Sequence, residues 1–206
     1  MSPRRGNIDN RCPKCSINHE LCYCDQISKR SSKTRVSVIF HIKERALTSN
    51  TGKIALQCLN NSKELIRGLK DQPIDEDFTV NESYTPLYLY PSDDAVDLDS
   101  DFLSSLDKPV NLIVPDATWR QTKRFHKRER ALDGIQHVKI PFSKSSIYQL
   151  RKQKYEDGLC TIEAIACALE VIEDKEIANH LMNVLKVMNQ RMMDTRTYRK
   201  NLMPLL

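Results

Sequence analysis

The sequence predicts one α/β domain with a mostly parallel β-sheet, and three observations support this fold class. Short runs rich in β-branched and aromatic residues alternate with longer segments whose apolar residues recur at helical spacing. Alternation of this kind is typical of parallel strands joined by helices. The chain has 206 residues, of which 40% are hydrophobic, so it can bury one sizeable core.

Four strands are expected, over residues 36–40, 87–90, 110–114 and 137–140. The first is the β-branched run Val36-Ser37-Val38-Ile39-Phe40. The second and fourth end at Pro91 and Pro141, because proline cannot donate a hydrogen bond to a sheet. The third is the apolar run Val110-Asn111-Leu112-Ile113-Val114.

Four helices are expected between and after these strands, over residues 54–59, 119–132, 161–172 and 177–192. Asn50-Thr51-Gly52 offers a cap for the first helix. In the last two, apolar residues lie on one face, as at Ile162, Ile165 and Leu169, which is typical of helices that pack on a core.

Charge is strongly segregated along the chain. The net charge is only +5, yet residues 71–107 hold eleven Asp and Glu and no Lys or Arg. Elsewhere the remaining 16 acidic residues face all 32 Lys and Arg, so that part of the chain carries +16. A basic body favours a polyanionic partner, and an ordinary solvated surface is the alternative.

Hydropathy argues against a membrane protein. No apolar run approaches the ~20 residues of a transmembrane helix, and Met1-Ser2-Pro3-Arg4-Arg5 leads into no signal-peptide stretch. We therefore expect a cytoplasmic protein with no membrane partner and no evident obligate protein partner. In that compartment, seven cysteines indicate metal ligands or free thiols rather than disulfides.

Four of the cysteines lie within thirteen residues, as Cys12-x2-Cys15-x6-Cys22-x-Cys24. Two such pairs can complete a tetrahedral zinc site, and four thiolates leave no open position, so the ion would be structural. The alternative is four cysteines without a metal. Three further cysteines are spaced unlike ligands and are expected as small buried hydrophobes: Cys58, Cys160 and Cys167.

The third strand leads into a polar turn, Asp116-Ala117-Thr118-Trp119, which contains the only tryptophan of the chain. Six basic residues follow within eleven positions: Arg120, Lys123, Arg124, Lys127, Arg128 and Arg130. Binding sites of α/β sheets lie at the carboxyl ends of strands, which predicts a site here. The alternative is that Asp116 or Thr118 only caps the next helix and that Trp119 is core.

These motifs together resemble the DTW-domain family, which is named for the pattern Asp-x-Thr-Trp found here at 116–119. The other shared features cover roughly residues 12–170: the four-cysteine cluster, His41-Ile42-Lys43-Glu44 with Asn50-Thr51-Gly52, Leu89-Tyr90-Pro91, Tyr148-Gln149-Leu150-Arg151-Lys152-Gln153, and Leu159-Cys160-Thr161-Ile162-Glu163-Ala164. One departure is Ile42, where the family pattern has proline, and this leaves the role of His41 open.

The resemblance implies a tRNA-uridine aminocarboxypropyltransferase. Such an enzyme transfers the 3-amino-3-carboxypropyl group of S-adenosylmethionine to N3 of a uridine in tRNA and releases methylthioadenosine. It also implies a SPOUT-like fold with a knot toward the C-terminus, which pattern reading alone would not suggest. The chain then divides into a tail with the zinc segment, residues 1–33, and a catalytic domain, residues 34–206.

Site residues follow from the resemblance and from the strand ends. The sequence has no G-x-G-x-x-G turn and only five glycines, so other loops must hold the cofactor. Its expected contacts are Leu89, Tyr90, Pro91, Pro115, Leu150, Leu159, Cys160, Thr161 and Glu163. The catalytic residues are expected to be Asp116, Thr118 and Trp119, with Asp116 as general base or as the group that orients the cofactor's ammonium.

RNA contacts are expected from the basic residues after the motif. They are Arg120, Lys123, Arg124, Lys127, Arg128 and Lys152, with Tyr148 and Tyr155 as candidates for base stacking. Two rival readings remain. A SPOUT-like RNA methyltransferase would release S-adenosylhomocysteine, and a non-catalytic zinc-ribbon RNA-binding protein would bind no cofactor.

Overall fold

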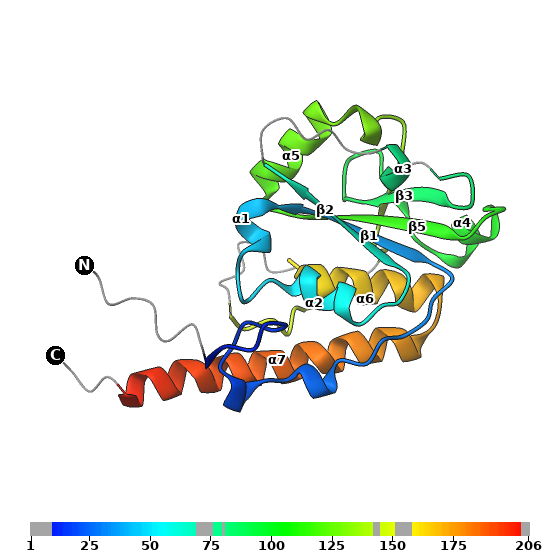
Figure 1. Ribbon diagram of the computed structural model, residues 1–206. Coiled ribbons are helices and arrows are strands. Elements are labelled where there is room, and N and C mark those ends of the chain that lie inside the picture. The colour runs from blue at the N-terminus through cyan, green and yellow to red at the C-terminus, as the bar shows by residue number, and fades with distance from the viewer. Residues whose placement is uncertain (1–9, 69–75, 80, 142–144, 151–157, 203–206) are drawn as a thin grey trace.

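The computed structural model describes residues 10–68, 76–79, 81–141, 145–150 and 158–202 (Figure 1). In this part of the chain six strands form one sheet, in the order β2-β1-β5-β3-β6-β4, and every neighbouring pair runs parallel. The strands are β1 Arg35–His41, β2 Ser62–Arg67, β3 Thr85–Leu89, β4 Val96–Asp97, β5 Val110–Asp116 and β6 Gln136–Lys139. The prediction of a mostly parallel α/β sheet is confirmed.

Helices cover both faces of the sheet. In Figure 1, α2, α6 and α7 lie below it and α3 and α5 lie above it. The helices are α1 Ile42–Arg45, α2 Thr51–Gln57, α3 Glu76–Thr79, α4 Ser100–Ser104, α5 Trp119–Arg128, α6 Thr161–Ile172 and α7 Lys175–Leu202. None of the described helices has the length and apolar character needed to cross a bilayer.

The two faces are built by alternation along the central strands. On β5, Leu112 and Val114 join the large apolar cluster that includes α6 and α7, whereas Ile113 points to the opposite face. There Ile113 packs in a smaller cluster with Phe125 of α5. Both faces of β1, β3 and β5 are therefore buried, which is why their sequences read as continuous apolar runs.

Two strands were not predicted, and both lie at edges of the sheet. The sequence of β2 is Ser-Lys-Glu-Leu-Ile-Arg, with two of its first three residues exposed. Strand β4 has only two residues, both exposed. Edge strands need less apolar surface, so they carry a weak sequence signal.

The boundaries of three predicted helices also differ from expectation, and the helix predicted over 54–59 is α2, Thr51–Gln57. The helix predicted over 119–132 ends at Arg128, where Glu129 takes an extended conformation and a 3-10 turn, Arg130–Leu132, follows. The helix predicted over 177–192 runs from Lys175 to Leu202, because polar outer turns continue the helix after its apolar stripe ends.

Candidate active site

A cleft of about 1390 Å3 opens at the carboxyl ends of β3, β5 and β6. The segments that form its walls come from widely separated parts of the sequence. The described residues that line it include Glu44, Leu47, Ser49, Asn50, Thr51, Leu89, Tyr90, Pro91, Asp97, Pro115, Asp116, Thr118, Trp119, Arg120, Val138, Lys139, Ile140, Tyr148, Leu150, Leu159, Cys160 and Thr161. The predicted position, at strand ends of a parallel sheet, is where the cleft lies.

Asp116 is the last residue of β5 and lies in the wall of this cleft with only 6% of its surface exposed. Burial raises the pKa of its carboxyl to about 6, because desolvation disfavours the charged form, and the charge of Glu44 adds to the effect. Polar contacts with Thr161, Asn50 and the backbone of Gly52 act in the opposite direction. At neutral pH the carboxyl is therefore ionised, yet more basic than a free aspartate.

The two carboxylate oxygens of Asp116 have different surroundings. Oδ1 accepts a hydrogen bond of 3.0 Å from Nδ2 of Asn50. Oδ2 is buried and makes no hydrogen bond to the residues that the structure describes. A Cβ atom on Gly52 would lie 2.3 Å from Oδ2 and 2.9 Å from the ring of Phe40. Only glycine at position 52 lets the carboxylate and the start of α2 approach this closely.

Thr118 and Trp119 begin the helix that follows. Thr118 caps α5 in a capping box: its hydroxyl accepts from the Gln121 backbone N–H at 3.4 Å, and its own N–H donates to the Gln121 side chain at 2.8 Å. Capping is thus part of what Thr118 does, in addition to lining the cleft. Trp119 is not core, because 47% of its surface is exposed, and its ring centroid lies 5.9 Å from that of Tyr90.

Eight of the nine predicted cofactor contacts line the cleft, namely Leu89, Tyr90, Pro91, Pro115, Leu150, Leu159, Cys160 and Thr161. Glu163 is instead buried behind the wall. Its carboxylate accepts hydrogen bonds from the Ile147 N–H at 2.6 Å, the Ser146 hydroxyl at 2.7 Å and the Cys160 N–H at 2.7 Å. Glu163 therefore joins the start of α6 to the segment that carries Tyr148 and Leu150.

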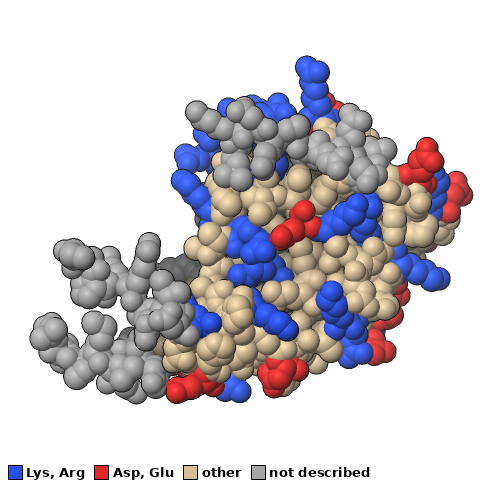
Figure 2. Space-filling model, in the orientation of Figure 1, with Lys and Arg blue, Asp and Glu red and all other residues tan. Residues whose placement is uncertain are grey.

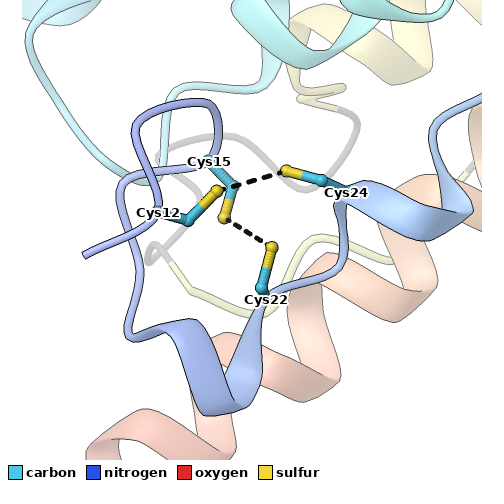
Figure 3. A group of neighbouring side chains, drawn as sticks. All are labelled: Cys12, Cys15, Cys22 and Cys24. Atoms are coloured by element: carbon cyan, nitrogen blue, oxygen red, sulfur yellow. Dashed lines mark hydrogen bonds between the residues drawn. The ribbon is translucent and has the colours of Figure 1, made fainter. Parts of the chain in front are cut away.

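The four clustered cysteines come together in the N-terminal segment, within residues 12–24. Figure 3 shows their thiols pointing toward one another, with Sγ–Sγ distances of 3.6 Å for Cys12 and Cys24 and 3.7 Å for Cys15 and Cys22. All four sulfur atoms lie within 4.8 Å of one another. Zinc–sulfur bonds of about 2.3 Å place tetrahedral sulfur atoms roughly 3.8 Å apart, so these thiols fit a zinc ion.

Local electrostatics around the thiols are uneven. Backbone N–H groups of Cys15 and Lys14 lower the pKa of Cys12 to about 6, although burial opposes them. Burial raises the pKa of Cys15 and of Cys24. A cation among them would offset that cost, because a metal favours the thiolate.

The remaining cysteines divide into two groups. Cys58 and Cys167 are buried, as predicted for small hydrophobes. Cys160 is half-buried and lines the cleft as the N-cap of α6. Burial raises the pKa of its thiol well above the usual value, and the nearby Glu163 carboxylate adds to this. Cys160 therefore stays protonated at neutral pH.

Comparisons with known proteins agree with these motifs. The DTW domain family model matches residues 9–193. The chain belongs to the DTW domain family. It is 28% identical over 167 residues to tRNA-uridine aminocarboxypropyltransferase 2 of Macaca fascicularis, covering 79% of this chain and 56% of that protein. The Drosophila melanogaster protein of the same name is 26% identical over 195 residues, covering 91% of this chain and 77% of the relative.

The chain thus spans little more than half the length of the primate relative that it matches. A solved structure with a similar fold is the SAM-dependent rRNA:acp-transferase Tsr3 from Vulcanisaeta distributa. Its TM-score is 0.50 at 17% sequence identity, and the match covers 80% of each chain. At this identity the likeness shows the fold.

In this DTW domain the helix after the motif presents a basic surface. Arg120 lines the cleft, and Lys123, Arg124, Lys127 and Arg128 are exposed along α5. In Figure 2, Lys and Arg side chains lie where Figure 1 has α5, and also over α1 and α2. Lys152 and Tyr155 fall outside the described residues. Tyr148 is buried, and its hydroxyl donates to the Ser49 carbonyl at 2.9 Å, so it braces a loop of the cleft.

His41 has a local structural explanation. It ends β1 and caps α1, because its Nδ1 accepts from the Lys43 N–H at 3.2 Å. Its ring stacks on Phe125 with centroids 6.4 Å apart, so it links the end of β1 to α5. Burial lowers the pKa of His41, and the charge of Lys43 lowers it further, so the ring is neutral at pH 7.

Several residues of the cleft were missed by sequence reasoning. Glu44, Leu47 and Ser49 follow β1, whereas Lys139 is the last residue of β6 and Ile140 comes directly after it. Both groups lie at the carboxyl end of a strand that had been predicted, so the rule that placed Asp116 could also have found them. Asp97 belongs to β4, a two-residue strand with no signal of its own.

Proposed function

We propose that this protein transfers the 3-amino-3-carboxypropyl group of S-adenosylmethionine to N3 of a uridine in tRNA, with release of methylthioadenosine. The observation that carries the proposal is Asp116, a buried and unusually basic carboxylate in a large cleft whose rim is the basic helix α5. The similar tRNA-uridine aminocarboxypropyltransferases support the reaction and the substrate.

The cleft suits S-adenosylmethionine chemically. Apolar side chains such as Leu89, Val138 and Leu159 offer a surface for an adenine ring. Trp119 presents an aromatic face of the kind that attracts cations such as a sulfonium. The backbone amides at the start of α6, beside Thr161, favour a carboxylate. When bound, S-adenosylmethionine would supply an electrophilic carbon at the γ position of its methionine part.

Asp116 is proposed to act on the proton of uridine N3. An ionised carboxylate with a pKa near neutrality can accept that proton, and general-base catalysis contributes roughly 10²- to 10⁴-fold. The competing role for Asp116 is to accept a hydrogen bond from an ammonium group and so orient the donor. In either role the carboxylate must be charged and held in one direction.

The choice of carbon is proposed to depend on position. The methyl group beside the sulfonium is also electrophilic, and a small displacement decides which carbon is in line with the nucleophile. Trp119 and Tyr90 wall the cleft and restrict that displacement. Arg120 and the exposed cations of α5 are proposed to bind tRNA phosphates beside the cleft.

Three structural assignments accompany this function. Cys12, Cys15, Cys22 and Cys24 are proposed to hold a structural zinc ion, supported by their sulfur–sulfur distances. Residues 1–33 are proposed as the zinc segment with its tail, and 34–206 as the catalytic domain. A SPOUT-like knot toward the C-terminus is proposed from the family resemblance, and the parallel α/β sheet is compatible with it.

The decisive experiment uses bulk tRNA and two labelled forms of S-adenosylmethionine. Label in the carboxyl carbon should enter tRNA, label in the methyl group should not, and nucleoside mass analysis should show 3-(3-amino-3-carboxypropyl)uridine. Methyl label in the RNA would instead indicate a methyltransferase. If neither label is transferred to several bulk RNAs while RNA binding persists, a binding module is the better account.

A further inference from the structure

Asn50 makes two hydrogen bonds with its side-chain amide, and both are internal. Its Oδ1 accepts from the Lys53 backbone N–H at 2.8 Å and so caps α2. Its Nδ2 donates to Oδ1 of Asp116 at 3.0 Å. The cap can be made only by the amide oxygen, so the amide nitrogen must face Asp116. Only 6% of the Asn50 surface is exposed.

We propose that Asn50 is the positioning residue for Asp116: it fixes the direction of the carboxylate and keeps it ionised for the transfer reaction. This inference rests on the proposed function, because it assigns a role relative to the residue that the function depends on. Asn50 itself is proposed to act through Asp116.

The geometry around the carboxylate supports this role. Asn50 holds one oxygen, and the close approach of Gly52 limits movement of the other. The loop that carries Asn50 is braced from behind, because the buried Tyr148 hydroxyl donates to the Ser49 carbonyl at 2.9 Å. A neutral amide donor stabilises the charged form of an acid without adding a charge of its own.

Few charged groups compete with Asn50 for this carboxylate. Glu44, in α1, is the acidic residue whose charge acts on Asp116, and it favours protonation. From α6, the Glu163 carboxylate is already engaged by three donors. From α2, Lys53 contributes its backbone N–H to the cap, and Arg120 of α5 lines another part of the cleft. Loss of the amide donor therefore leaves burial and Glu44 opposed only by the contacts of Asp116 with Thr161 and with the Gly52 backbone.

Two substitutions separate positioning from capping. Asn50→Ser keeps an oxygen that can cap α2 but removes the amide N–H group that donates to Asp116. Asn50→Asp also keeps the capping oxygen and places a carboxylate about 3 Å from Asp116, so the pair shares one proton more readily. Asn60→Asp, at an exposed asparagine after α2, is the control for the same charge change.

The expected readout is the pH dependence of transfer. The acid limb of kcat should move upward by at least about one pH unit in Asn50→Asp and by less in Asn50→Ser. Such a one-unit shift should cost the Asn50→Asp variant about 2-fold in kcat at pH 7 and about 10-fold at pH 5. Asn60→Asp should keep the wild-type limb. A ¹³C titration of the Asp116 carboxyl, assigned with Asp116→Asn, should show the same order without reference to activity.

Two results would overturn the inference. One is a wild-type pH limb and a wild-type carboxyl titration in both Asn50 variants. The other is a loss of activity that only follows a lower melting temperature, because that is what a capping role alone predicts. If the wild-type protein transfers nothing, the proposed function fails, whereas the ¹³C titration still decides whether Asn50 controls the charge of Asp116.

Discussion

The four-cysteine segment and the Asp116 cleft are assembled over very different distances along the chain. All four cysteines come from thirteen residues, and a short turn suffices to bring their sulfur atoms within 4.8 Å of one another. Around Asp116, by contrast, Asn50 is 66 residues away and Thr161 is 45 positions further along. The first cluster depends on local geometry, and the second depends on the order of strands in the sheet.

Because of this difference, the two regions depend on different parts of the fold. The cysteine segment has few apolar side chains of its own, although Ile17 and Tyr23 pack into the main core. Its ligands are nearly preformed, so an ion can complete it. The cleft needs β1, β5 and α6 in place before Asn50, Asp116 and Thr161 can meet. The regions should therefore respond differently to the same kind of change.

Removal of one thiol should give the largest effect and should be confined to the first region. We expect about one zinc per chain, and Cys22→Ser should lose it, because apparent zinc binding of roughly 10 kcal/mol needs all four ligands. Metal analysis and limited proteolysis of the N-terminal segment measure this. His19→Ala, in the same turn, should keep the ion. Protein purified without chelators that contains no zinc would contradict the prediction.

The second largest effect concerns catalysis in the cleft. Asp116→Ala should bind S-adenosylmethionine but transfer at least ~10²-fold more slowly if Asp116 is the base. Single-turnover transfer and calorimetric binding separate the two steps. Asp101→Ala, an exposed acid of α4, is the control and should behave as wild type. Lost binding with an unchanged rate at saturation would favour the role in orienting the donor.

Sequence reasoning performed differently in the two regions for a physical reason. The four cysteines lie within thirteen consecutive residues, so their spacing alone predicted the whole cluster. Asp116 was also predicted, because a continuous apolar run marks a central strand and its end marks a site. The contacts of Asp116 with Asn50 and Gly52 were not, since they depend on β1 lying beside β5.

Other misses have the same origin. Glu163 is close in sequence to residues that line the cleft, but its carboxylate accepts hydrogen bonds from the backbone N–H groups of Ile147 and Cys160. Only the folded chain reveals these hydrogen bonds. The edge strand β2 is polar enough to read as a loop. For Thr118, capping and a place in the site were opposed as alternatives, whereas in the structure it caps α5 and also lines the cleft. The exposure of Trp119 could not be read from composition.

The third effect tests the cost of holding Asp116 buried. Its pKa is raised from 3.8 to about 6 in the folded protein, so the stability that protonation gives is present below pH 4 and is lost as the pH rises through 6. At pH 8, Asp116→Asn should therefore raise the free energy of unfolding by up to about 3 kcal/mol. Near pH 4 the variant and the wild type should be similar. Urea unfolding at both pH values measures this, and equal gains at both would exclude the ionisation as the cause.

The smallest effect concerns the exposed basic residues of α5, which lie beside the cleft rather than in the cysteine segment. Replacing Lys123, Arg124 and Lys127 together with glutamine should raise the Kd for tRNA about 10-fold at moderate salt. It should also reduce the slope of log K against log salt by about two to three, because three phosphate contacts no longer release counterions. Affinity for S-adenosylmethionine should stay unchanged, since these side chains lie outside the cleft lining.

A charge-matched control makes this last prediction specific to α5. Lys108, Lys175 and Lys186 are exposed, and none of them lies on α5 or among the residues that line the cleft. Their replacement by glutamine removes the same net charge, so any general loss of attraction appears in both variants and cancels in the comparison. Equal weakening by the two triple variants would mean that tRNA responds to overall charge. Greater weakening by the α5 variant would support tRNA binding beside Trp119, at the proposed entry of the uridine.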